Sequence, residues 1–173
     1  MYLNALEFLE EEREAWRPFE ALDSLTDEQL DTPIDEAHDW SGRDLISHLV
    51  AWQENCLEVA KELAVGETSK TKERSDAEWE ERGDAINLDI QVEWRALPIG
   101  EVRRRLREVP GELRGYLTVV PESRWLKHAD NLSFFLEETI DHYADHAADL
   151  EAILDACAAG VPDLATQKAT RDD

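Results

Sequence analysis

Cysteine is scarce in this chain of 173 residues, which contains only Cys56 and Cys157. Two cysteines are too few for the disulfide framework of a small secreted domain or for a cysteine-rich zinc site. Both lie among apolar residues at helical spacing, so we predict buried, reduced thiols rather than nucleophiles.

Long hydrophobic runs are also missing. No stretch approaches the ~20 apolar residues that a membrane-spanning helix needs. The first residues have no basic segment followed by an apolar one, and glutamates stand at positions 7, 10, 11 and 12 instead. This start does not fit a signal peptide, and we expect a cytoplasmic protein.

Positive charge is low, because 18 Lys and Arg face 41 Asp and Glu, which gives a formal charge of −23. Such a charge repels phosphate backbones and anionic lipid headgroups, so neither nucleic acid nor a membrane surface is an expected partner. The acidity fits adaptation to high salt as well as it fits an ordinary acidic bacterial protein. A hydrophobic content of 42% and six Trp predict a folded core.

Strand signals are absent, and apolar residues recur at helical spacing almost throughout. We predict an all-α four-helix bundle with short extra helical turns, in a single domain over residues 1–160, followed by a flexible tail over residues 161–173. The predicted helices cover residues 2–25, 42–65, 75–96, 99–119 and 132–158, and a capping box at Thr26 predicts a short extra turn.

The clearest predicted helix begins after Ser41, whose hydroxyl can cap it, and Asp44 at the third helical position suits the helix dipole. Its apolar residues recur every three or four positions, as on the inward face of a bundle helix. Other features are less specific. Ser75 is a second capping-box candidate, Pro18 could kink the first helix, and Pro110 either kinks or splits the helix around it.

Two histidines in the last predicted helix are the main candidates for chemistry. His142 and His146 are four residues apart, so their rings differ by roughly 40° around a helix and project from one face. They lie along the edge of the apolar stripe, where an unpartnered charged imidazole would be costly. A metal ion or a hydrogen-bond partner is therefore implied.

We nominate His48, on the helix after Ser41, as the third member of a site. Three neutral imidazoles plus water suit Zn²⁺, Ni²⁺ or Fe²⁺. Glu138 and Asp149 lie within about 40° of His142 on the helical wheel, so they could orient the imidazoles or add a ligand. The alternative is that His142 and His146 only form hydrogen bonds within a helix interface.

Short motifs give the chain a family resemblance. WSGRD at residues 40–44, followed by HLVAW at 48–52, resembles the second-helix signature of the DinB-like four-helix-bundle superfamily. The pair in HYADH at 142–146 is similar to its fourth-helix signature, and WRALP at 94–98 resembles members close to the N-terminal domain of mycothiol-dependent maleylpyruvate isomerase. The similarity extends in element order to about residue 158.

The resemblance implies a function for the three histidines. In that superfamily the matching residues, here His48, His142 and His146, bind a divalent metal, and characterised members include transferases and isomerases that use mycothiol or bacillithiol. The leading hypothesis is a metal-dependent thiol S-transferase acting on a small electrophile, with a low-molecular-weight thiol such as mycothiol as cofactor. Whether the chain is an enzyme stays open.

Two other hypotheses are retained. One is a non-enzymatic binding or resistance protein that holds a small molecule in the same bundle cavity, and the other is an interaction module whose histidines only pack. A homodimer could form through Trp79, Trp94 and Trp125. His38 and His128 are expected to be exposed loop residues.

Overall fold

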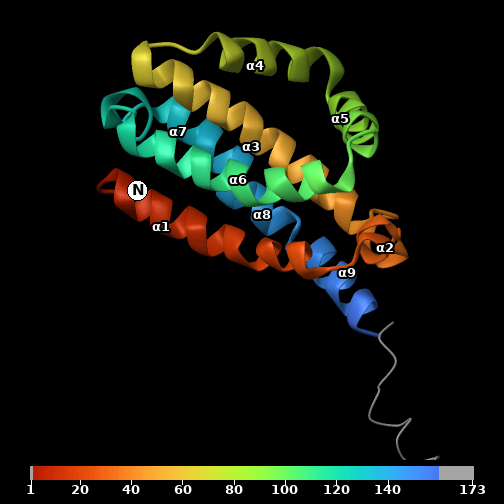
Figure 1. Ribbon diagram of the computed structural model, residues 1–173. Helices are drawn as coiled ribbons and strands as arrows, with labels where there is room; N and C mark the ends of the chain where they lie inside the picture. Colours follow the sequence, from red (N-terminus) through yellow and green to blue (C-terminus); the bar gives the residue numbers. More distant parts are fainter. Residues whose placement is uncertain (1, 160–173) are drawn as a thin grey trace, which may run out of the picture.

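The computed structural model describes residues 2–159, and this part of the chain is all-α, with no strand beyond an isolated bridge between Ile34 and Trp40. Four long segments form the bundle (Figure 1). They are α1 (Ala5–Trp16), α3 (Gly42–Val65), α6 (Ile99–Val119), and a C-terminal segment made of α7 (Ala129–Leu136), α8 (His142–Asp145) and α9 (Ala147–Ala159). The predicted four-helix bundle is confirmed. The predicted tail lies outside the described residues.

The first segment is shorter than predicted. α1 ends at Trp16, and the chain continues as a 3₁₀ helix, η1 (Arg17–Ser24), with Pro18 in its first turn. On this first segment the Leu6 side chain is 62% exposed, whereas those of Trp16 and Phe19 are buried. Proline lacks the backbone donor that a continued α-helix would need, which explains the change of helix type.

The predicted capping box before α2 (Asp27–Asp31) and the predicted Ser41 cap of α3 are confirmed, and the Ser41 cap is itself part of a capping box. Thr26 caps α2, and the Ser41 hydroxyl accepts a hydrogen bond from the Asp44 backbone while the Asp44 carboxylate accepts one from the Ser41 backbone. The predicted inward face of α3 is buried throughout, at positions 45, 49, 52, 56, 59 and 63. Between α2 and α3 the chain makes a short turn, η2 (Asp35–Ala37).

The region before α6 differs from the prediction in two ways. α4 (Lys70–Arg82) begins earlier than expected, because Ser69 rather than Ser75 accepts the hydrogen bond that caps it. Gly83, at φ 50°, then separates α4 from α5 (Ala85–Arg95), where one helix was predicted. In Figure 1, α4 crosses the bundle on the outer side of α3.

α6 packs along α3 and contains Pro110 without being split by it. A short turn, η3 (Glu122–Arg124), leads to α7, which begins three residues before the predicted helix. Two of the aromatic residues proposed for a dimer interface are used elsewhere. Trp94 is 2% exposed and Trp125 is not exposed at all, so neither can contribute to such an interface, and a homodimer stays a prediction.

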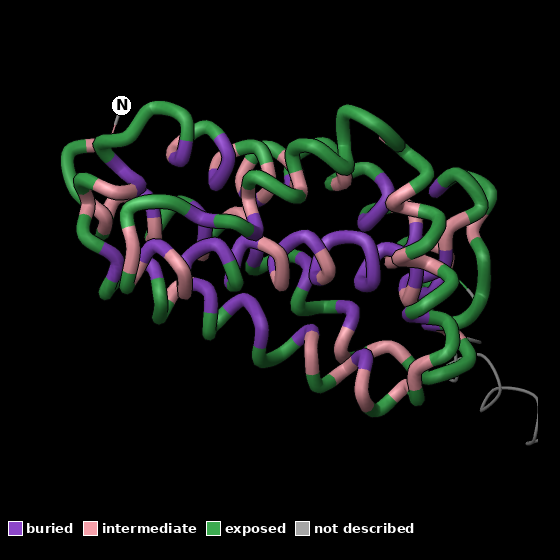
Figure 2. The backbone as a smooth tube through the Cα atoms, turned by 90° about the horizontal axis from the view of Figure 1, so that it is seen from above, coloured by how far each residue is buried: buried purple, intermediate pink, exposed green. Residues whose placement is uncertain are grey.

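The core has two apolar clusters separated by a polar layer. Buried residues line the inner sides of the helices, and exposed residues the outer sides (Figure 2). On α1, Phe8 belongs to one cluster and Trp16 to the other, and the buried Glu12 lies between them. Gln53 holds the corresponding place on α3, between buried stretches that belong to different clusters. None of the helices in residues 2–159 has the length and apolarity that crossing a membrane requires.

Candidate metal centre

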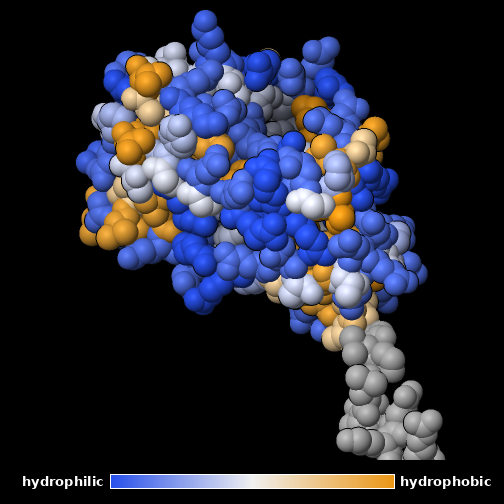
Figure 3. All heavy atoms as spheres, in the orientation of Figure 1, coloured by the Kyte–Doolittle hydropathy of each residue, from blue (hydrophilic) through white to orange (hydrophobic). Residues whose placement is uncertain are grey.

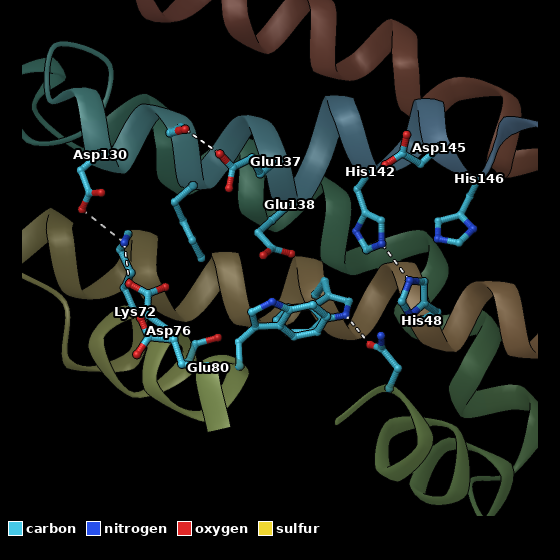
Figure 4. A pocket seen from close by; sticks show the side chains of 16 residues that line it. His48, Lys72, Asp76, Glu80, Asp130, Glu137, Glu138, His142, Asp145 and His146 are labelled. Carbon is cyan, nitrogen blue, oxygen red and sulfur yellow. Dashed lines mark hydrogen bonds and ion pairs between the residues drawn. The ribbon is translucent and has the colours of Figure 1, made fainter. Parts of the chain in front are cut away.

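The three histidines nominated from the sequence meet inside the bundle. His48 projects from α3, and His142 and His146 project from the C-terminal segment (Figure 4). The Nε2 atoms of His48 and His142 are 2.8 Å apart, and each of the three residues offers a ring nitrogen within 4.8 Å of the others. His48 is 5% exposed. The triad therefore forms a possible metal site, and metal binding by it stays a prediction.

The C-terminal segment is not the regular helix that the wheel assumed. A π-helical turn, η4 (Glu137–Asp141), lies directly before His142, and α8 ends at His146, where the backbone has φ −100° and ψ 8°. A π-turn carries an extra residue and changes the direction of the side chains that follow, which is why such turns are frequent at functional sites. The four-residue spacing of His142 and His146 could not by itself predict this change in side-chain direction.

Trp40 closes one side of the triad. Its indole stacks on the His146 ring at a centroid distance of 5.3 Å and meets the His48 ring edge-on at 5.0 Å. The loop before it is tight, because His38 and Asp39 both adopt positive φ and the Ile34 amide donates to the Trp40 carbonyl. Sequence analysis used Trp40 only as part of a motif, and its contact with the imidazoles depends on this loop conformation.

Asp149 orients the site from behind. Its carboxylate accepts a hydrogen bond from His146 Nδ1 at 2.8 Å and lies 3.0 Å from His38 Nδ1, and the residue is 6% exposed. A proton on His146 Nδ1 leaves Nε2 of that ring free to act as a ligand. The predicted orienting role of Asp149 has this geometric basis. The His38 side chain is exposed as expected, but it also contacts Asp149, which sequence analysis missed.

The surroundings of two of the three histidines, His48 and His142, favour neutral rings. Burial, together with the nearby His142 and His146, lowers the pKa of His48 to about 3. Burial and the nearby His146 lower the pKa of His142 to about 4. Both imidazoles are therefore uncharged at neutral pH, as metal ligands must be.

The donor set fits a divalent ion. Two buried ring nitrogens, Nδ1 of His48 and Nδ1 of His142, have no hydrogen-bond partner within the described residues. The observed spacings of 2.8 Å and at most 4.8 Å bracket the separation of roughly 3.4 Å expected for two nitrogens bound tetrahedrally to one Zn²⁺. Three neutral nitrogen donors suit Zn²⁺, Ni²⁺ or Fe²⁺ better than Mg²⁺ or Ca²⁺, which prefer oxygen.

A cavity of about 560 Å³ opens beside the triad, between α3, α4 and the C-terminal segment. All three histidines contribute to its wall, together with Trp52 and Trp79. Glu138 points into this cavity, and its carboxylate forms no hydrogen bond or ion pair with any residue in the described range (Figure 4). Burial, with Glu137 and Asp76 nearby, raises the pKa of its carboxyl to about 7.

The WSGRD motif has a structural explanation. Arg43 donates hydrogen bonds to three carbonyls at the end of α5, those of Trp94, Arg95 and Leu97, and the Arg95 guanidinium in turn pairs with Asp44 at 2.8 Å. The motif therefore joins the start of α3, which carries His48, to α5. Its charged residues hold the scaffold and do not reach the cavity.

Comparison with protein families gives one result. The model of the DinB superfamily matches residues 8–153, and this chain belongs to that superfamily. Comparison with curated proteins finds no significant match, and comparison with solved structures finds none either.

Proposed function

We propose that this DinB superfamily protein binds one divalent metal ion through His48, His142 and His146 and transfers a low-molecular-weight thiol to a small electrophile in the adjoining cavity. The observation that carries the proposal is the meeting of three imidazoles, two of them kept neutral by burial, at the wall of a cavity large enough for a drug-sized molecule. When bound, a divalent ion would supply Lewis acidity that lowers the pKa of the thiol.

The protein's own residues define the rest of the site. Asp149 fixes the orientation of His146, and Trp40 shields two of the rings from water. In the reaction the thiol sulfur forms a bond to the electrophilic carbon, the leaving group departs with its electron pair, and the thiol proton passes to solvent.

The cysteines support an external thiol rather than one from the protein. Cys56 has no exposed surface, and burial raises the pKa of its thiol well above the ordinary value. Cys157 is 8% exposed, and neither cysteine lines the cavity. A buried thiol with a raised pKa is a poor nucleophile, so the sulfur would have to come from a cofactor.

Two measurements test the proposal. Protein purified without a His tag should contain about one divalent ion per chain, and the double variant His142→Ala, His146→Ala should lose it while keeping its helical circular dichroism. Stoichiometric metal in that variant would overturn the ligand assignment. The metal-loaded protein should then consume 1-chloro-2,4-dinitrobenzene with at least one thiol from a panel that includes mycothiol.

The second measurement separates an enzyme from a binding protein. If the loaded protein binds electrophiles in the cavity but gives no more conjugate than the double variant, transferase activity is excluded for that panel. The non-enzymatic binding or resistance protein that shares this cavity then becomes the better description.

A further inference from the structure

The cavity beside the triad is unusually acidic for a small-molecule site. Six carboxyl groups line it against a single ammonium group, that of Lys72, so its wall carries a formal charge of −5 when every carboxyl is ionised and the histidines are neutral. The acidic residues are Asp76, Glu80, Asp130, Glu137, Glu138 and Asp145. With a divalent ion bound at the triad, the formal charge of the cavity would still be −3.

At its far end the cavity already holds one ammonium group. Lys72 Nζ lies 2.7 Å from an Asp76 oxygen and 3.3 Å from an Asp130 oxygen, and it sits over the Phe134 ring at 5.4 Å from the centroid. Two carboxylates and one aromatic face thus hold a cation there. Figure 4 shows this group at the opposite end of the cavity from His48 and His142.

A similar combination without a cation lies between Lys72 and the histidines. Trp52 and Trp79 form an aromatic corner, with ring centroids 5.7 Å apart and planes at 79°. The Trp52 indole N–H donates to Asn87 Oδ1 at 3.0 Å, which fixes its orientation. Glu80 and Glu138 line the same cavity, Glu80 on the side of Lys72 and Glu138 nearer His142 (Figure 4), and neither forms an ion pair with any residue in 2–159. We call these four residues, Trp52, Trp79, Glu80 and Glu138, the ammonium subsite.

Two further features indicate that the subsite is built for a ligand. Trp79 lines the cavity and is 45% exposed, so its indole is accessible to a ligand there. The Glu138 side chain points into the cavity between Lys72 and His142, and its carboxylate has no partner within the described residues (Figure 4). A largely buried carboxylate without a partner is costly, and a bound cation would offset that cost.

We propose that the ammonium subsite binds a protonated amine or quaternary ammonium group of the protein's small-molecule substrate. The inference rests on the proposed function, because it assigns a substrate class to the same cavity. The indole faces attract the cation, Glu80 and Glu138 neutralise it, and the electrophilic part of the molecule extends toward the histidines. The excess of carboxylates excludes phosphate and carboxylate compounds of similar size.

The test compares choline with 3,3-dimethylbutan-1-ol, its neutral isostere with carbon in place of nitrogen. Titrations followed by the six indole N–H signals in NMR, in 0.2 M NaCl to suppress non-specific attraction, should show saturable shifts of Trp52 and Trp79 only. We expect choline to bind at least ~5-fold more tightly than the isostere, as cation–π contacts and paired carboxylates require. Equal affinities, or shifts spread over all six indoles, would overturn the proposal.

Substitutions in the ammonium subsite test which side chains bind the cation. Trp79→Ala should weaken choline binding by ~3-fold or more and Trp79→Phe should restore most of it, because an aromatic face is what the cation needs. Glu80→Gln with Glu138→Gln should remove the preference over the isostere. Glu112→Gln removes one exposed acidic residue on α6 and serves as the matched control, with unchanged binding expected. An equal loss in this control would show general charge attraction and overturn the assignment.

Metal analysis of the same samples separates the two proposals. If metal binds at one ion per chain and thiol conjugation proceeds while choline and its isostere bind alike, the ammonium subsite is wrong and the proposed function stands. If choline binds selectively at Trp52 and Trp79 in a protein that takes up no metal, the subsite stands and the proposed function is wrong.

Discussion

Asp149 accepts a hydrogen bond from Nδ1 of His146 at 2.8 Å, on the side of the ring away from the other two histidines. Asp149 is buried on α9, one turn beyond the end of α8. A carboxylate behind an imidazole fixes the ring's tautomer and increases its basicity. The relationship makes Asp149 a positioning residue for the candidate metal centre.

Replacing this carboxylate should weaken metal binding without unfolding the protein. Asp149→Asn keeps the size of the side chain but removes its charge, and we expect a loss of ~10- to 100-fold in Zn²⁺ affinity. Competition with a chromophoric chelator measures it, and Asp155→Asn, an exposed position on α9, is the control. An affinity equal to that of wild type would show that Asp149 does not act on the site.

Glu138 should make the protein less stable as the pH rises. Burial raises the pKa of its carboxyl from 4.5 to about 7, so the folded state binds the proton more tightly than the unfolded state does. This contribution is complete below pH 4.5 and is lost as the pH passes through 7, with a total of roughly 3 kcal/mol. Glu138→Gln should remove it.

Urea unfolding at pH 5 and pH 8, with a chelator present, tests this expectation. The variant should gain stability over wild type from pH 5 to pH 8, while Glu151→Gln, at an exposed position on α9, should show no such trend. If Glu138→Gln differs from wild type by the same free energy at both pH values, the raised pKa is refuted.

The polar layer between the two apolar clusters contains a buried ion pair. Arg114 Nη1 lies 2.9 Å from an oxygen of Glu12, which is not exposed at all, and Glu12 also accepts a hydrogen bond from the Tyr143 hydroxyl. Removal of one partner leaves a buried charge, so Arg114→Ala should cost about 3–5 kcal/mol of unfolding free energy. Chemical denaturation measures this loss.

A surface arginine on the same helix provides the control. Arg104 pairs with Glu101 and Glu108, and its side chain is 48% exposed. Arg104→Ala should therefore cost less than about 1 kcal/mol. Similar losses for Arg104→Ala and Arg114→Ala would mean that burial does not decide the strength of these pairs here.

Substitution of glycine by alanine should change the stability of the protein in opposite directions at two positions. A Cβ on Gly115, in the exposed face of α6, would meet nothing within 4 Å, and Gly115→Ala should stabilise the protein by about 0.5–1 kcal/mol. A Cβ on Gly42 would lie 3.0 Å from a Leu30 methyl carbon, so Gly42→Ala should destabilise it by about 1 kcal/mol. Thermal unfolding of both variants measures these changes in stability. A gain in stability for Gly42→Ala would contradict the tight packing around Gly42.

The candidate site could be predicted in part because its signals are local. His142 and His146 share one segment, and the capping box at Ser41 and Asp44 fixes where α3 begins and hence which way His48 faces. The family motifs identify the same three histidines. The ends of α1 and α4 could not be predicted as well, because competing caps and 3₁₀ turns differ by small free energies.

The sequence by itself determined the helical class, the largely hydrophilic surface seen in Figure 3, the net negative charge and the identity of the three histidines, because hydrophobic spacing and charge are properties of the chain. Only the tertiary structure decided what surrounds those histidines. Trp40, Asp149 and the ammonium subsite come from segments far apart along the chain. A positive-φ loop, a π-turn and the crossing of α4 bring them together, and these depend on packing between segments rather than on local sequence pattern.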